Sequence, residues 1–300
     1  TLTEKSSIVS LGDTSVYKAA EEKHGKVDLS ESALNADGFV IFTYGNNVFI
    51  NAYNDRGIMY GAFEFIEHTF GVKFLTEDYT HVPQASEIVL KSYDKTYRPA
   101  FKQRAYLNTS VFGKKTEYVA HMRFNTDYCP MPENMGGSTK WHEFGNPAHT
   151  FPAIVSLTEY IGDDGQITPD YRAAFAHLGA GDNMTTYKAT DGTVLDLCYT
   201  SGIKEDGTGD TVTEKTAFKM VTDSLKTIIR EDETSEWYML GQADRPMGCP
   251  CDDCKNARVK YEASGLMIRF VNAVNTEIQS WIKSENLNRN IKFCLFAYDY

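Results

Sequence analysis

The sequence lacks the features that mark three special classes of protein. It contains no apolar run approaching the roughly 20 residues that a membrane-spanning helix needs. Its formal net charge is −11, so it also lacks the excess of Lys and Arg on which general binding to nucleic-acid phosphates depends. It shows no internal repeat and no low-complexity tract. We therefore expect a soluble globular protein with no membrane span in this chain and no nucleic-acid partner.

Cysteine is scarce as well, and the six cysteines are too scattered to form the framework of a small disulfide-stapled protein. Three of them, Cys249, Cys251 and Cys254, lie within six residues, a spacing that can ligate zinc if a fourth ligand joins them. A usual zinc site shows a second ligand pair, whereas the other three cysteines are isolated in the sequence. We therefore favour a loop-stabilising role and expect no metal and no cofactor, with zinc binding and a disulfide as the alternatives.

The chain also begins without a recognisable leader. Its first residues, Thr1-Leu2-Thr3, include neither a Met nor a positively charged apolar stretch. We expect a processed or trimmed product whose targeting peptide has been removed. Its location must then follow from its substrate rather than from a targeting signal.

Apolar residues, in contrast, are plentiful. Hydrophobic residues make up 42% and aromatic residues 13% of the 300 residues, which is enough to build a sizeable core. Domains usually contain about 50 to 250 residues, so this length favours two domains over one. The pattern changes near Tyr97-Arg98-Pro99-Ala100, and we predict one domain at residues 1–95 and a second at 96–300.

Residues 37–83 predict a compact α+β unit. Two apolar runs separated by Gly45-Asn46-Asn47 predict a β-hairpin. The run from Gly57 to Thr69 predicts a helix that ends at Gly71 and is followed by a short strand. One face of this helix is expected to carry Ile58, Ala62, Phe65 and Ile66.

From Phe101 onward, strand-like runs alternate with amphipathic helices, which is typical of a parallel sheet. A helix is predicted over 214–230, with Thr211 and Glu214 at capping-box spacing. A strand at 236–243, a second helix and a strand at 291–298 follow. The predicted fold is α/β: a small α+β domain followed by a (β/α)8 TIM-type barrel. A full barrel takes about 250 residues, so we expect an incomplete one here.

Asp244 is the first candidate for catalysis. The apolar strand 236–243 runs directly into it, and Pro246 and Gly248 then break the strand. In parallel α/β folds, loops gather around a substrate at the carboxyl ends of the strands. The alternative is that Asp244 only caps the following turn.

Two groups of residues resemble known glycosidases. The stretch Tyr53–Glu67 with Gly71–Leu75 resembles the small α+β domain that precedes the barrel in β-hexosaminidases and α-glucuronidases. The second region is similar to glycoside hydrolase family 163. That similarity is carried by His149-Thr150-Phe151, Leu197-Cys198, Asp244 with Cys249-Pro250-Cys251 and Cys254, Ser264-Gly265 and Phe270-Val271-Asn272.

The resemblance implies a retaining endo-β-N-acetylglucosaminidase that acts on complex N-glycans by a substrate-assisted route. In that route the sugar's 2-acetamido oxygen attacks the anomeric carbon, and an enzyme carboxylate orients the amide, a role that Asp244 fits. Glycoside cleavage also needs a protonated carboxyl group at the leaving oxygen. Asp299, at the end of the next predicted strand, is the candidate partner, although hexosaminidases carry adjacent Asp and Glu where this chain has Asp244-Arg245.

Five further residues are candidates for substrate binding. The resemblance implies that Arg104, in the first barrel strand, binds sugar hydroxyls with its guanidinium fork; an Arg paired with a carboxylate is the alternative. Aromatic rings stack on sugars but more often fill cores, and among them we expect Trp141 to be the more exposed and Trp237 to be packed. The candidates are Arg104, Asn125, His149, Trp141 and Tyr298.

The predicted partner is an oligosaccharide or a glycoprotein glycan, and the predicted location is secreted, cell-surface or periplasmic. Three other functions compete with this hypothesis. An α-glucuronidase-like hydrolase would need a basic patch facing the uronate carboxylate, for which Arg104 and Arg245 are available. A non-catalytic carbohydrate-binding protein would lack the second carboxylate. A redox or metal protein would use the cysteine cluster as its active centre.

Overall fold

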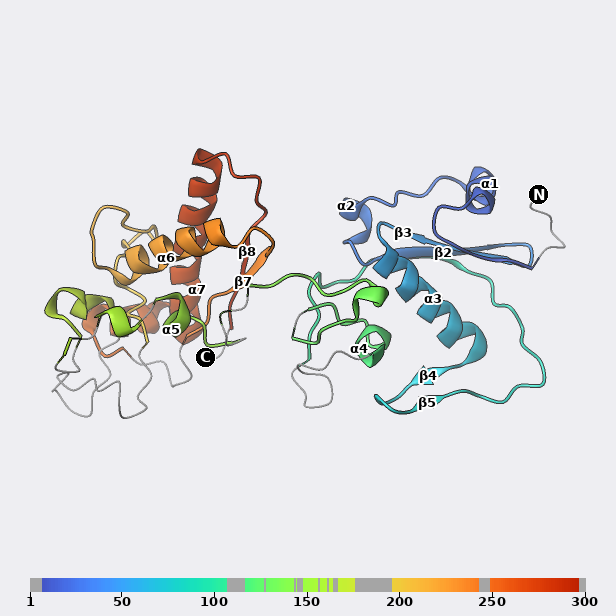
Figure 1. The fold of residues 1–300 in the computed structure, drawn as a ribbon, viewed down its shortest axis with the longest axis horizontal. Coiled ribbons are helices and arrows are strands. Elements are labelled where there is room, and N and C mark those ends of the chain that lie inside the picture. Colours follow the sequence, from blue (N-terminus) through green and yellow to red (C-terminus); the bar gives the residue numbers. More distant parts are fainter. Residues whose placement is uncertain are drawn as a thin grey trace. The chain divides into compact units, whose positions relative to one another are not determined.

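The computed structural model describes residues 7–106, 117–126, 128–142, 144, 148–155, 157–160, 162–163, 167–175, 196–242 and 249–296. The chain divides into two compact units, Thr1–Thr139 and Lys140–Tyr300 (Figure 1). The predicted division between residues 95 and 96 lies inside the first unit and stays a prediction about domains. Within the part that the structure describes, every helix is too short or too polar to cross a membrane.

The first unit is built on a four-stranded sheet with the order β1-β3-β2-β6. Strand β1 pairs in parallel with β3, and β2 pairs antiparallel with both β3 and β6. The predicted hairpin is confirmed: β2 and β3 are joined at Gly45, whose φ of 59° suits a tight turn. The strands are β1 (Val9–Leu11), β2 (Phe39–Tyr44), β3 (Asn47–Ala52) and β6 (Asp94–Tyr97).

Helix α3 (Asp55–Phe70) covers this sheet (Figure 1). It begins where the Asn54 side chain accepts the Gly57 N–H, and it ends at Gly71, whose φ is 71°. A Cβ at Gly61 would lie 2.5 Å from Ile50 Cγ2, so the glycine allows the helix to approach the sheet closely. The buried face carries Gly57, Tyr60, Gly61 and Phe63. The expected face of Ile58, Ala62, Phe65 and Ile66 is only half-buried, because those residues lie beside the contact.

Shorter elements complete the first unit. Helices α1 and α2 each begin at a Ser or Thr cap, and β4 pairs antiparallel with β5. Helix α4 adds Val119 and Ala120 to the hydrophobic cluster beneath α3. These elements are α1 (Ser15–His24), α2 (Glu31–Leu34), β4 (Lys73–Phe74), β5 (Thr80–His81), α4 (Glu117–His121) and the 3-10 turn η1 (Glu133–Met135).

The second unit contains parallel strands β7 (Trp237–Met239) and β8 (Lys292–Cys294). The segment at 140–142 lies on the other side of β7, where Trp141 forms a parallel bridge with Trp237. Helix α6 (Ala217–Glu231) precedes β7, and α7 (Asp252–Ser284) connects β7 to β8. The predicted alternation of parallel strands and helices is therefore present, in shorter strands than predicted. The described residues show three parallel segments and small sheets, and they do not show a TIM barrel.

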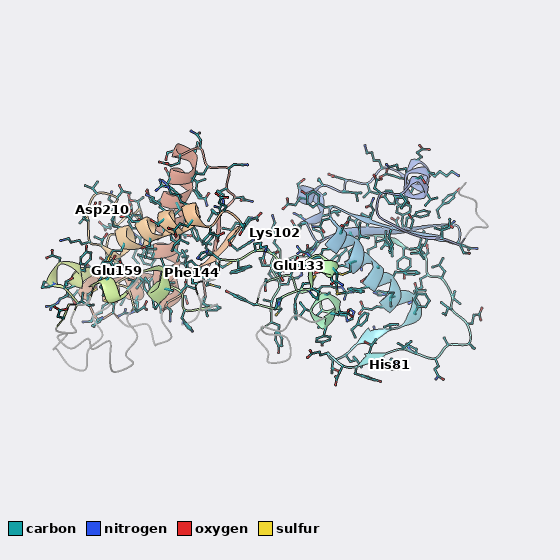
Figure 2. All side chains as sticks on the ribbon, in the orientation of Figure 1. His81, Lys102, Glu133, Phe144, Glu159 and Asp210 are labelled. Atoms are coloured by element: carbon teal, nitrogen blue, oxygen red, sulfur yellow. The ribbon has the colours of Figure 1, made fainter. Side chains whose placement is uncertain are left out.

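One hydrophobic cluster fills the second unit. Helix α6 contributes Val221, Leu225 and Ile229, and α7 contributes Phe270 and Val274. Around these helices lie short turns: α5 (Phe151–Ile154), η2 (Leu157–Tyr160) and η3 (Pro169–Ala174). Phe144, labelled in Figure 2, also belongs here, since its ring lies 4.4 Å from His142 and 6.2 Å from Tyr238 between centroids.

Candidate functional site

The carboxyl end of β7 is held by the segment that begins at His149. The Thr150 hydroxyl donates to the Met239 carbonyl at 2.6 Å and accepts the Gly241 N–H at 3.0 Å. The Gly241 carbonyl in turn accepts the N–H groups of Thr150 and Phe151. Thr150 is fully buried, so these bonds fix the segment against the strand end in place of a regular sheet ladder.

His149 is placed at this strand end. Its Nδ1 lies 2.8 Å from the Gln242 carbonyl oxygen. A carbonyl only accepts, so Nδ1 donates the proton of this hydrogen bond. The Phe296 ring, which follows β8, lies 6.5 Å from the imidazole between centroids. His149, Gln242 and Phe296 thus meet where β7 and β8 both end.

The predicted catalytic residues continue from these same two strand ends. Asp244 follows Gln242 by two residues, and Tyr298 and Asp299 follow Phe296 by two and three. All three lie outside the described residues. Their predicted roles stay predictions, and the structure contributes the strand ends from which they extend.

Trp141 and Trp237 reverse their expected exposures. Trp141 is only 9% exposed, and its ring stacks on Trp237 with centroids 5.8 Å apart. Trp237 is the more open of the two and lies beneath the Lys292 ammonium, 5.0 Å from the ring centroid. The expectation that Trp141 exposes its ring was wrong because residues 140–142 join β7 as a sheet neighbour. Its predicted role in stacking on a sugar stays untested.

Arg104 and Asn125 lie together in the first unit around the buried carboxylate of Asp37, which is 1% exposed. Arg104 Nη2 donates to Asp37 Oδ2 at 2.6 Å, and Asn125 Nδ2 donates to the same oxygen at 2.6 Å. Arg56 donates to Oδ1 through Nε and Nη2, each at 2.7 Å. One carboxylate thus joins two guanidinium groups and an amide.

The other two nitrogens of the Arg104 guanidinium also donate within the chain. Its Nε donates to the Arg123 carbonyl at 2.7 Å, and Nη1 donates to the Phe101 carbonyl at 2.8 Å. Its side chain is 17% exposed. This geometry is the alternative that the sequence left open, an Arg paired with a carboxylate. A sugar hydroxyl would have to share this guanidinium with protein acceptors.

Two features of the second unit were missed by sequence reasoning. Asp196 is a buried carboxylate, 4% exposed, that accepts the Tyr199 hydroxyl at 2.6 Å. Burial, followed by the charge of Asp196, raises the pKa of Tyr199 well above its ordinary value. Cys198 is isolated in the sequence, whereas in the structure its Sγ lies close to those of Cys249, Cys251 and Cys254. Leu197-Cys198 was noted only as part of a family resemblance, and no local spacing links it to residues more than 50 positions away.

Residues 74–300 match the family model described as a domain of unknown function, DUF4838. The chain belongs to this family. The DUF4838 match covers the parallel strands, the His149 segment, Arg104, Asn125 and the four clustered cysteines. A partial similarity extends to the "Probable alpha-glucuronidase A" of Aspergillus terreus (strain NIH 2624 / FGSC A1156), at 34% identity over 96 residues. That match spans 32% of this chain and 11% of the relative.

Proposed function

We propose that this protein is a glycoside hydrolase acting on an oligosaccharide or a glycoprotein glycan. The observation that carries the proposal is the meeting of two parallel strand ends at His149, Gln242 and Phe296, from which Asp244 and Asp299 follow in the sequence. Enzymes with parallel α/β folds, such as TIM barrels, assemble their catalytic groups at the carboxyl ends of the strands. The partial similarity to a probable α-glucuronidase supports the same class of reaction.

In the specific form of the proposal, these residues belong to a TIM-type barrel of glycoside hydrolase family 163. The substrate is an N-glycan, and the N-acetylglucosamine acetamido group supplies the nucleophile while Asp244 orients its N–H. Asp299 or another acid protonates the leaving oxygen. His149, whose Nδ1–H is fixed by the Gln242 carbonyl, lies at the same strand end and contributes its ring to the sugar-binding surface. The support is the family resemblance of the sequence together with the placement of His149.

The test is release of glycans from an N-glycoprotein, measured by mass spectrometry. We expect Asp244→Asn to lower the rate by about 100-fold or more, the size typical for removal of a positioned acid–base group. Glu233→Gln is the matched control, because Glu233 is exposed and precedes the amino end of the same strand. Near-normal release by Asp244→Asn would remove Asp244 from the mechanism.

An α-glucuronidase-like hydrolase is the second candidate, favoured by the name of the similar relative. The two activities are separated by offering an aryl α-glucuronide beside the N-glycoprotein. Cleavage of the glucuronide alone would replace the N-glycan assignment and retain the glycosidase class. Binding of either sugar without cleavage would instead indicate a carbohydrate-binding protein.

The proposed location is secreted, cell-surface or periplasmic, because glycoprotein glycans are found outside the cytoplasm. Fractionation of the producing cells, followed by immunodetection, tests it. Recovery of the protein in the cytoplasmic fraction alone would contradict an extracellular glycan substrate.

A further inference from the structure

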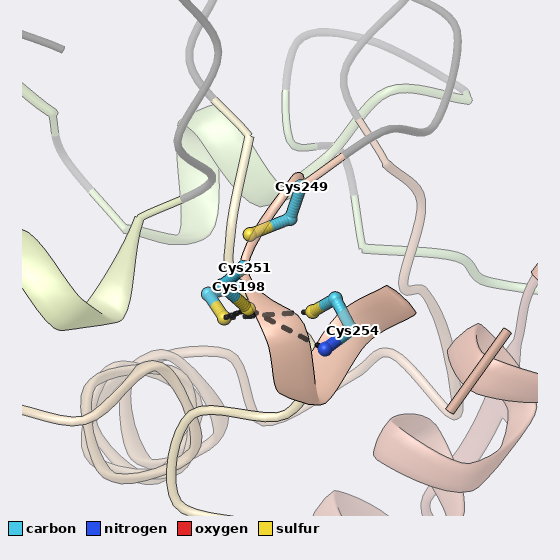
Figure 3. A group of neighbouring side chains, drawn as sticks. All are labelled: Cys198, Cys249, Cys251 and Cys254. Atoms are coloured by element: carbon cyan, nitrogen blue, oxygen red, sulfur yellow. Dashed lines mark hydrogen bonds between the residues drawn. The ribbon is translucent and has the colours of Figure 1, made fainter. Parts of the chain in front are cut away.

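Four cysteine side chains converge at the start of α7. The Sγ atoms of Cys198, Cys249, Cys251 and Cys254 all lie within 4.8 Å of one another (Figure 3). Cys249 and Cys251 precede the helix, Cys254 lies in its first turn, and Cys198 comes from a separate segment. All six cysteines of the chain fall within the described residues, and none of them is joined in a disulfide there.

The separations between these sulfur atoms suit a single metal ion. Cys198 Sγ lies 3.8 Å from Cys251 Sγ and 3.6 Å from Cys254 Sγ. Zinc–thiolate bonds of about 2.3 Å in a tetrahedron place neighbouring sulfurs about 3.8 Å apart. A disulfide would require about 2.05 Å. The cluster therefore has the dimensions of a tetrahedral four-sulfur site.

The four sulfur atoms are largely shielded from solvent, and hydrogen-bond donors point toward them. Cys198, Cys249 and Cys254 are at most 5% exposed, and Cys251 is half-buried. Cys251 Sγ caps α7 by accepting the Cys254 N–H at 3.4 Å, which fixes this sulfur at the start of the helix. The Thr200 hydroxyl lies 3.1 Å from Cys254 Sγ and 3.4 Å from Cys198 Sγ. Donors of this kind around the ligands tune and orient metal-bound sulfur.

A side chain of α7 also fixes the backbone at Cys249, in the loop that carries Cys249 and Cys251. Arg258 lies in the second turn of α7, and its Nη1 donates to the Cys249 carbonyl at 3.0 Å. The guanidinium therefore binds the backbone of the loop and leaves the sulfur atoms facing one another. Cys198 and Cys251 are 53 residues apart in the sequence. A shared ligand would fasten the segment at 196–200 to the beginning of α7.

We propose that Cys198, Cys249, Cys251 and Cys254 bind one Zn²⁺ ion as four thiolates in a closed structural site. Sulfur-only tetrahedral coordination selects zinc or iron among the biological metals. Four protein ligands leave no open position for a substrate or a catalytic water, which is the arrangement of structural rather than catalytic zinc. The site replaces the loop-stabilising role expected from the sequence with a metal-dependent one, and it does not depend on the proposed glycosidase activity.

The first test is elemental analysis of the protein purified without chelators. We expect one zinc per chain, falling to near zero in Cys198→Ser and Cys254→Ser. Cys129→Ser and Cys294→Ser are the controls, because both lie outside the cluster, and they should keep full zinc content. Equal zinc content in the cluster variants and in the controls would overturn the site.

The second test uses the unchanged protein, so it does not depend on the folding of any variant. Removal of zinc with a strong chelator should make four additional thiols reactive toward a thiol reagent, and zinc should protect them again. Cobalt(II) added to the chelated protein should give the intense visible absorption of a tetrahedral thiolate complex. Two outcomes would overturn the proposal. One is purified protein with two disulfides in the cluster, and the other is a cluster of four free thiols that binds neither zinc nor cobalt(II). Stoichiometric iron would overturn the assignment of the ion.

Discussion

Asp37 shows how a single residue can join distant parts of the first unit. Its two oxygens accept from Arg56, Arg104 and Asn125, and Arg104 is 67 residues away in the sequence. The sequence identified Arg104 and Asn125 as polar residues of interest, but it gave no sign of Asp37. Ion pairs over such separations leave no local pattern, because they depend on how the chain folds back.

Replacing Asp37 tests whether this network is structural. Asp37→Ala leaves two largely buried guanidinium groups without their counter-ion, and we expect a loss of about 3 to 5 kcal/mol in the free energy of unfolding. Urea denaturation followed by circular dichroism measures it. Asp94→Asn serves as the control, since the Asp94 side chain is 87% exposed. A loss below about 1 kcal/mol would show that the two arginines find other partners.

Gly241 leaves the space in which the His149 segment packs against the end of β7. A Cβ at this position would lie 1.6 Å from the Ala148 carbonyl oxygen, so the backbone around His149 would have to move. We expect Gly241→Ala to lower the proposed glycosidase activity by about 100-fold, because a displacement of about 1 Å is enough for such a loss. Gly265→Ala, within α7 and at 3.1 Å from the nearest side chain, is the milder control. Equal activity of the two variants would contradict this placement of His149.

At the scale of elements, helices with an apolar stripe were the easiest to predict. The second helix predicted after the 236–243 strand is present as α7, and its apolar stripe from Met267 to Ile282 is buried. Helix α6 was also predicted, but Thr216 caps it and it begins at Ala217, rather than at the capping box of Thr211 and Glu214. The buried face of α3 was missed because Gly57 and Gly61 contribute close approach rather than hydrophobicity. Hydrophobic periodicity identifies helix faces with large apolar side chains. It does not identify a face on which glycines allow the backbone to approach its neighbour.

The connection between α6 and β7 is stabilised by Asp232, which ends the helix. Its carboxylate accepts the N–H groups of Thr234 and Ser235 and lies 2.7 Å from His142 Nδ1. Burial opposes ionisation most strongly, but the hydrogen bonds from Ser235, His142 and Thr234 together hold the pKa of Asp232 well below its ordinary value. This carboxylate is therefore bound in its charged form.

An acid whose pKa is lowered by folding stabilises the fold at every pH above its ordinary pKa. This contribution is lost as the pH falls from the ordinary pKa toward the pKa of the folded state. We expect the contribution of Asp232 to be complete at neutral pH and to decline below the ordinary pKa of 3.8. Asp232→Asn should cost about 2 kcal/mol at pH 7, as expected for hydrogen bonds to a charged group. The difference from the unchanged protein should shrink at pH 3. A difference that is constant between pH 7 and pH 3, measured by urea denaturation, would contradict a role for the charge.

At the scale of the whole molecule, each unit has its own hydrophobic clusters. Those around Phe39 and Phe42 belong to Thr1–Thr139, and the one around Phe270 belongs to Lys140–Tyr300. Alternating strand and helix patterns were sufficient to predict a chain of mixed helices and strands, and the predicted division into domains stays a prediction. The compact unit Thr1–Thr139 could not be read from the sequence, because residues 96–139 pack by long-range contacts, such as that of Arg104 with Asp37, that no local pattern encodes.

Separate cores predict separate unfolding. Calorimetry should resolve two transitions, since two-state behaviour is expected of single domains rather than of the whole chain. Asp37→Ala should lower only the transition of the first unit, and zinc removal should lower only that of the second, because the four cysteines all lie in Lys140–Tyr300. Cys129→Ser in the first unit should leave the response to the chelator unchanged. A single transition that shifts with both treatments would mean that the two units unfold as one, and the separate clusters would then not define independent folding units.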